Sequence, residues 1–331
     1  MGLKERALAL SDEAIVLRRD FHQNPELGFE ETRTARVVAD YLRNLGIHVE
    51  TGVGKTGVVG IWEGKGPGKT VLIRADMDAL PIQEANQVSY ASKNPGVMHA
   101  CGHDGHTTMG LLAAKLLTGV GHTLSGRLVF VFQPAEEGRG GARAMLADGL
   151  LDKAHPDRAL CVHLWNRSPV GKVAISPGPV LASADVFRIV VRGEGGHGAA
   201  PHRSSDVITA ACHMVTAFQT VVSRSVNPID TAVVSVGQFQ AGEAPNVLPD
   251  HAELRGTIRT YALDVRELVI KRIQEIGQGI AASMGVRFSF ELTYSTPATV
   301  NDAEVVKLVQ GIAREMFGPE NVVSDHRTMA S

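Results

Sequence analysis

The chain has 331 residues, 44% hydrophobic and 21% charged, with a formal net charge of −2 at pH 7. This is the composition of an ordinary globular enzyme of about two domains, without the excess of positive charge that is typical of nucleic-acid-binding proteins. No apolar run approaches the roughly 20 residues that span a bilayer, so we expect neither a nucleic acid nor a membrane as partner.

The N-terminal segment predicts an amphipathic helix. Residues 1–22 carry charges throughout and lack the uninterrupted apolar core of a signal peptide. Four apolar residues fit one buried face of such a helix: Leu3, Leu10, Ile15 and Leu17. A second helix is expected over 30–46, ending at a glycine.

Apolar runs alternate with helical patterns between residues 47 and 165. We expect helices at 108–120 and 141–151, and buried strands at 126–137 and 158–165. Buried strands alternating with helices predict an α/β fold, with a mostly parallel sheet covered on both faces. The Gly-rich stretch 137–143 is expected to form a tight loop.

The pattern changes after residue 184. From 185 to 295 the expected order is strand, helix, strand, strand, helix, strand, which is typical of a ferredoxin-like α+β domain. We therefore expect a discontinuous first domain, 1–184 with 296–331, and an inserted domain at 185–295.

The chain has three cysteines, Cys101, Cys161 and Cys212. So few, and an odd number, do not make a disulfide framework. We therefore expect a reducing compartment, the cytoplasm.

Side chains that bind metals follow several predicted strands. The set consists of Asp76 and Asp78, Glu136 and Glu137, His163, and the pair Cys101 and His103 before a helix. Each alone has an ordinary explanation: a core or surface histidine, a solvated helix start, a small buried apolar cysteine. Because sites in open α/β sheets form at the carboxyl ends of strands, their coincidence predicts one metal site.

The adjacent pair Glu136 and Glu137 predicts a division of roles. A water molecule activated by a metal needs a base to accept its proton. One carboxylate can bind the metal while its neighbour, whose side chain diverges from it, acts as that base.

Eight stretches of the sequence together carry a family resemblance. In chain order they are "RRDFHQNPELGFEE" (18–31), "RADMDALP" (74–81), "MHACGHDGHTTMGL" (98–111), "FQPAEEGRGGARAML" (132–146), "HLWNRSPVG" (163–171), "GEGGHGAAPH" (193–202), "APNVLPDHAELRGTIR" (244–259) and "HRTMAS" (326–331). These stretches resemble the M20 metallopeptidase family. Within it they are similar to the amidohydrolase branch. That branch contains hippurate hydrolases, N-acyl-amino-acid amidohydrolases and auxin-conjugate hydrolases.

The resemblance implies a metal centre. Cys101, His103, Glu137 and His163 match the family's metal ligands. They would hold one or two divalent ions per subunit, manganese or zinc, with the cysteine between the ions. Glu136 matches the general base, and Asp76 matches a carboxylate that orients a ligand. Where other branches have His-x-Asp, this chain has Arg74-Ala75-Asp76, so one histidine ligand is absent there.

The inserted domain matches the family's dimerisation, or lid, domain. His197 matches a histidine that reaches a neighbouring active site and polarises the scissile carbonyl, although a surface histidine in a hairpin would look the same. Asn246 and Arg259 match residues that hold the substrate carboxylate. Arg259 could also be a surface arginine whose aliphatic side chain packs on the protein while its charged end reaches solvent. Its planar guanidinium, however, also suits a carboxylate.

We therefore expect a homodimeric hydrolase that cleaves N-acyl amino acids to a carboxylate and a free amino acid. The alternatives are a dipeptidase or another deacylase on the same scaffold, and an inactive binding or dimerising protein. The resemblance also implies that relatives continue beyond "SDHRTMAS" (324–331) to one more histidine ligand. On that basis the chain is expected to be a truncated form, weakly active or inactive and prone to aggregate.

Overall fold

The computed structural model describes residues 2–330, apart from the side chain of His122; Ser331, the end of the last motif, lies outside them. The chain divides into two compact units, residues 1–169 and 170–331. The domain boundaries expected at 184/185 and 295/296 stay a prediction. Within the second unit, segments 173–181 and 299–323 pair with each other through short strands.

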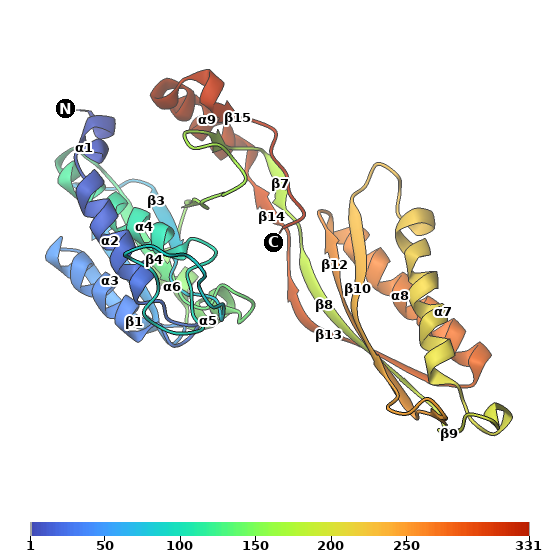
Figure 1. Cartoon of the computed structure of the whole chain (residues 1–331). Coiled ribbons are helices and arrows are strands. Elements are labelled where there is room, and N and C mark those ends of the chain that lie inside the picture. Colours follow the sequence, from blue (N-terminus) through green and yellow to red (C-terminus); the bar gives the residue numbers. More distant parts are fainter. Residues whose placement is uncertain (1, 331) are drawn as a thin grey trace. The chain divides into compact units, whose positions relative to one another are not determined.

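The first unit combines helices with one five-stranded sheet (Figure 1). Its helices are α1 (Leu3–Leu8), α2 (Ser11–Gln23), α3 (Thr32–Asn44), α4 (His103–Gly119), η1 (Gly121–Thr123), α5 (Gly141–Ala147) and α6 (Leu150–Ala154). Its strands are β1 (His48–Val53), β2 (Gly57–Glu63), β3 (Thr70–Asp76), β4 (Arg127–Gln133) and β5 (Arg158–Cys161), in the order β1-β2-β4-β3-β5.

The sheet is mixed. Strand β3 pairs parallel with β4 and with β5, whereas β2 pairs antiparallel with β1 and with β4. The expected parallel arrangement therefore holds for β3, β4 and β5, the strands whose carboxyl ends carry the candidate ligands.

Helices cover both faces of this sheet, as the buried strands predict. Phe21, Leu42 and Phe130 belong to a core that α2, α3 and α4 form with one face. Val129 and Met145 belong to a second core, between the other face and α5 and α6. Because successive side chains of a strand point to opposite faces, β4 contributes to both cores.

Two expectations for the first unit are wrong. The N-terminal segment forms two helices instead of one, and Leu3 and Ile15 are 49% and 47% exposed, so only part of the predicted face is buried. Strand β5, expected to be buried, is exposed at each of its four residues. The reason is its place at the edge of the sheet, where it pairs only with β3.

The second unit contains a four-stranded antiparallel sheet in the order β10-β12-β8-β13. Its main elements are β8 (Ala184–Arg192), α7 (Val207–Thr220), the π-helical turn η3 (Val221–Ser225), β10 (Ala232–Ala241), β12 (His251–Thr260), α8 (Leu263–Met284) and β13 (Arg287–Thr296). They follow the strand and helix order expected for 185–295. Helices α7 and α8 lie side by side over one face (Figure 1), where Phe187, Met214, Leu254 and Ile273 form the core.

A further helix, α9, and several short elements complete the second unit. They are β6 (Val173–Ala174), β7 (Gly178–Leu181), β9 (Gly196–His197), η2 (Pro201–Arg203), β11 (Val247–Leu248), β14 (Thr299–Asn301), α9 (Ala303–Phe317), η4 (Pro319–Asn321) and β15 (Val322–Val323). Among the described residues, no helix has the length and apolarity to cross a membrane.

Candidate metal centre and active site

The site of the first unit lies where β3, β4 and β5 end and α4 begins. Strand β3 ends at Asp76, and β4 ends at Gln133 shortly before the glutamate pair. Strand β5 ends two residues before His163, and α4 starts at His103. The strands thus carry metal-binding side chains from four separate segments to one edge of the sheet.

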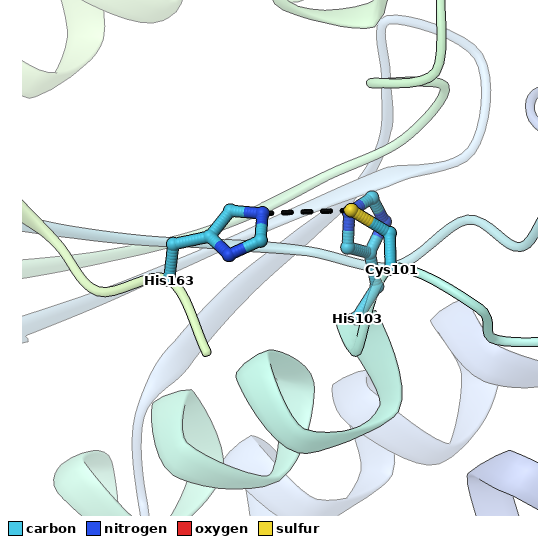
Figure 2. A group of neighbouring side chains, drawn as sticks. All are labelled: Cys101, His103 and His163. Carbon is cyan, nitrogen blue, oxygen red and sulfur yellow. Dashed lines mark hydrogen bonds between the residues drawn. The ribbon is translucent and has the colours of Figure 1, made fainter. Parts of the chain in front are cut away.

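His103 is the centre of this cluster. Three groups of potential ligand atoms, each within 4.8 Å of one another, all contain this histidine. The groups are Cys101 with His103 and His163, Asp76 with His103 and His106, and His103 with Glu136 and Glu137. Figure 2 shows the imidazole of His163 facing Cys101 across the site, with Nε2 3.5 Å from the cysteine Sγ.

A carboxylate fixes the orientation of His103. Its Nδ1 donates to the backbone oxygen of Asp78 at 2.9 Å and lies 3.2 Å from Oδ1 of the same residue. The opposite atom, Nε2, is buried and has no hydrogen-bond partner among the described residues. Burial lowers the pKa of His103, but the contacts with Asp78 and Cys101 and the charge of Asp76 outweigh it and raise the pKa to about 11.

The glutamates face the same atom. Oε2 of Glu136 and Oε1 of Glu137 each lie 3.9 Å from Nε2 of His103. The N–H of Glu137 donates to Oδ2 of Asp78 at 3.0 Å, which ties the turn after β4 to the end of β3. Burial, followed by the charge of Glu137, raises the pKa of Glu136 to about 7, a value suited to a general base at neutral pH.

The residues fit a divalent cation. Besides Nε2 of His103, the buried Oε1 of Glu137 has no hydrogen-bond partner among residues 2–330, and buried polar atoms are ordinarily paired. The neighbouring imidazole of His103 lowers the pKa of the Cys101 thiol, but burial and the charge of Glu137 outweigh it, so the pKa is raised. A cation would reverse that balance, because it favours the thiolate. Thiolate, imidazole and carboxylate are the donors of transition-metal sites.

Asp76 and Asp78 have different partners. Oδ1 of Asp76 accepts from Nδ1 of His106 at 2.6 Å, and its Oδ2 pairs with Arg74 at 2.8 Å. Burial alone would raise the pKa of Asp76, but His106 and the Arg74 charge hold it well below its usual range. Asp76 lies 3.7 Å from Nε2 of His103. The carboxylate that orients His103 in the structure is Asp78, a residue that sequence reasoning placed at the strand end without a role.

The remaining candidates lie in the second unit. His197 on β9 pairs with Val247 on β11, and the oxygen of Asn246 accepts from the N–H of Gly198 at 2.8 Å, so His197 and Asn246 are neighbours. Arg259 is half-buried near the other end of β12. The structure therefore brings His197 and Asn246 together, but not Arg259.

Known proteins are similar to this chain along nearly its whole length. Residues 72–331 match the peptidase family M20/M25/M40. The chain is 42% identical to the hippurate hydrolase of Campylobacter jejuni over 99% of this chain and 85% of that protein. It is 43% identical to an N-acyl-L-amino acid amidohydrolase of Geobacillus stearothermophilus over 90% of this chain and 81% of that protein. The chain belongs to the M20/M25/M40 peptidase family.

Solved structures agree with this assignment. A Bacillus subtilis protein described as a dinuclear metal-binding peptidase of family M20 has a TM-score of 0.84 and 34% identity, and the match covers 98% of this chain and 84% of that one. The chain is therefore a hydrolase of the M20 family with amidohydrolase relatives. The family and this neighbour support the use of divalent metal ions by this chain.

Proposed function

We propose that this M20 hydrolase cleaves the amide bond of N-acyl amino acids of the hippurate type, releasing a carboxylic acid and a free amino acid. The names of two relatives support this substrate class. The observation that carries the chemistry is Glu136, with its pKa raised to about 7, beside a cluster of sulfur, nitrogen and oxygen donors.

Cys101, His103, Glu137 and His163 would hold one or two divalent ions, with manganese or zinc as the candidates. Such an ion, when bound, polarises an amide carbonyl and makes water more acidic. Glu136 accepts the proton of the attacking water and delivers it to the leaving amine. Glu137 would act as a metal ligand, because the hydrogen bond from its backbone N–H to Asp78 fixes its backbone beside His103.

In a homodimer formed by the domain at 185–295, His197 would reach a neighbouring active site. Nδ1 of His197 accepts from the N–H of Ala199 at 3.1 Å, so the proton of a neutral ring lies on Nε2. That N–H can donate to the oxygen on which negative charge develops. Asn246 and Arg259 would bind the substrate carboxylate. A cytoplasmic enzyme acting on small molecules is consistent with the sparse cysteines.

The paired variants Glu136→Gln and Glu137→Gln test this assignment. Loss of a general base lowers turnover on the order of 10²-fold or more, so Glu136→Gln should keep metal content while hippurate hydrolysis falls by that factor. Glu137→Gln should lose metal instead. Glu30→Gln, at an exposed site in the same unit, serves as the control and should change neither property.

Elemental analysis and release of glycine from hippurate measure the two properties. Exchanged phenotypes would mean that Glu137 is the base. Full activity of a preparation shown to be free of metal would overturn the proposal. A dipeptide and an N-acetyl amino acid in the same assay distinguish the two alternative activities, and activity on neither amide nor peptide would favour a binding protein.

A further inference from the structure

We propose that His106 is a positioning residue: together with Gly105 it forms a docking site for Leu164 and thereby holds the neighbouring side chain of His163 against the metal centre. The inference rests on the proposed function, in which His163 binds an ion. We call this docking site the Leu164 dock.

The segment that carries His163 follows an exposed edge strand. Strand β5 is short and exposed, and its last paired residue is Cys161, opposite Arg74. His163 lies two residues beyond that pair and is exposed. Its Nδ1 donates to the carbonyl oxygen of Leu164, at 2.6 Å, within the same segment. A ligand on such a segment needs an external contact to keep its place.

His106 provides that contact. Its buried ring lies one helical turn after His103, on the same side of α4. Nε2 accepts the N–H of Leu164 at 2.8 Å, which leaves Nδ1 to donate to Asp76 at 2.6 Å. The centroids of the His106 and His163 rings lie 4.6 Å apart.

The sheet anchors this chain of contacts. The guanidinium of Arg74 pairs with Asp76 at 2.8 Å and also donates to Oε1 of Gln133 at 2.9 Å. The backbone of the His163 segment is thereby connected, through two charged groups and one imidazole, to the ends of β3 and β4.

Gly105 is independent evidence for the dock. A Cβ at this position would lie 2.4 Å from Cδ1 of Leu164, so the end of this side chain, which is 48% exposed overall, lies against the backbone of α4. Glycine is less favourable than alanine within a helix, and here its absence of a Cβ admits Leu164. Both the N–H and the side chain of Leu164 therefore rest on the first two turns of α4, beside His103.

Two substitutions separate the two bonds of His106. In His106→Gln the side-chain oxygen can reach the position of Nε2 and still accept the N–H of Leu164. In His106→Asn the amide nitrogen can still donate to Asp76, but the bond to Leu164 is lost. Because groups that orient a metal ligand typically contribute 10–100-fold to metal affinity, His106→Asn should weaken binding of zinc by about tenfold or more, and His106→Gln by about threefold or less.

Thr107→Val is the matched control. The buried hydroxyl of Thr107 donates to the backbone oxygen of Asp76 at 2.8 Å, so its loss removes a buried bond from the same helix without touching Leu164. This variant should lower the melting temperature and leave zinc affinity unchanged. Affinity is measured by titration of metal-free protein, which requires no activity.

Cobalt provides a second readout. Since the dock does not touch Cys101, cobalt-saturated His106→Asn should keep the thiolate-to-cobalt charge-transfer band of the wild type. The inference would be overturned by any of three results. These are equal weakening of zinc binding in His106→Asn and His106→Gln, unchanged zinc binding in His106→Asn, and loss of the charge-transfer band in cobalt-saturated His106→Asn. Failure of the wild type to bind zinc or cobalt would instead refute the proposed function.

Discussion

Replacing Gly141 by alanine should disturb the turn that carries Glu136 and Glu137. Gly141 is buried at the start of α5, and its N–H donates to the oxygen of Ala135 at 2.9 Å. A Cβ at this position would lie 1.6 Å from the carbonyl oxygen of Pro134. That atom belongs to the backbone, so no side-chain rotation relieves the clash, and either α5 or the turn must move.

The magnitude follows from two opposing terms. Overpacking of this kind costs about 1–3 kcal/mol or more, whereas replacing a helical glycine returns at most about 1 kcal/mol. A net loss of about 2 kcal/mol in a domain of this size lowers the melting temperature by about 4–8 °C. Because displacement of a reacting group by 1 Å can cost on the order of 10²-fold, hippurate turnover should fall by about that factor.

Thermal unfolding and hippurate turnover of Gly141→Ala test this reasoning. Gly119→Ala is the control, because an added Cβ at the end of α4 meets no described atom within 4 Å. If both variants unfold at the wild-type temperature with full turnover, the turn tolerates a Cβ at position 141 and the argument fails.

Two predictions concern buried carboxylates outside the candidate ligand set. Burial raises the pKa of Glu31 above its ordinary 4.5, so the folded state binds the proton more tightly and stability falls as pH rises from 4.5 through the raised value. Glu31→Gln should therefore flatten the melting temperature over that range of pH, and an unchanged profile would contradict this. In the second unit, Arg266 donates to buried Asp185 at 2.7 and 2.8 Å. Arg266→Met should lower the free energy of unfolding by about 3–5 kcal/mol, because it leaves a buried charge unpaired; urea denaturation measures it, and a loss below about 1 kcal/mol would show that the carboxylate is solvated.

The convergence of the candidate ligands could be predicted from the sequence because it depends on topology. Strands that run parallel end at one edge, so residues following β3, β4 and β5 meet regardless of side-chain detail. The glutamate pair, His103 and Cys101 could be selected for the same reason. The helix and strand order of 185–295 was predictable from hydrophobic periodicity alone.

Side-chain direction could not be predicted in this way. Asp76 is the last residue of β3 and Asp78 lies two residues beyond it, and the path of the chain at the end of the strand decides that Asp78 faces Nδ1 of His103 while Asp76 faces His106. The exposure of β5 depends on its position at the sheet edge, which an apolar sequence does not reveal. For His106 a signal existed: its spacing of three residues from His103 places both on one face of α4.

The candidate ligands of this site are held with unequal firmness. The first turn of α4, which carries His103, is fixed by Asp104, whose buried carboxylate pairs with Arg18 at 2.8 Å and with His22 at 2.7 Å. Glu137 is held to Asp78 through its backbone. Among the described candidates, His163 follows an exposed edge strand. Since a metal site needs each ligand held by its surroundings, the contacts of the proposed Leu164 dock would decide whether His163 meets the geometry that the other candidate ligands define.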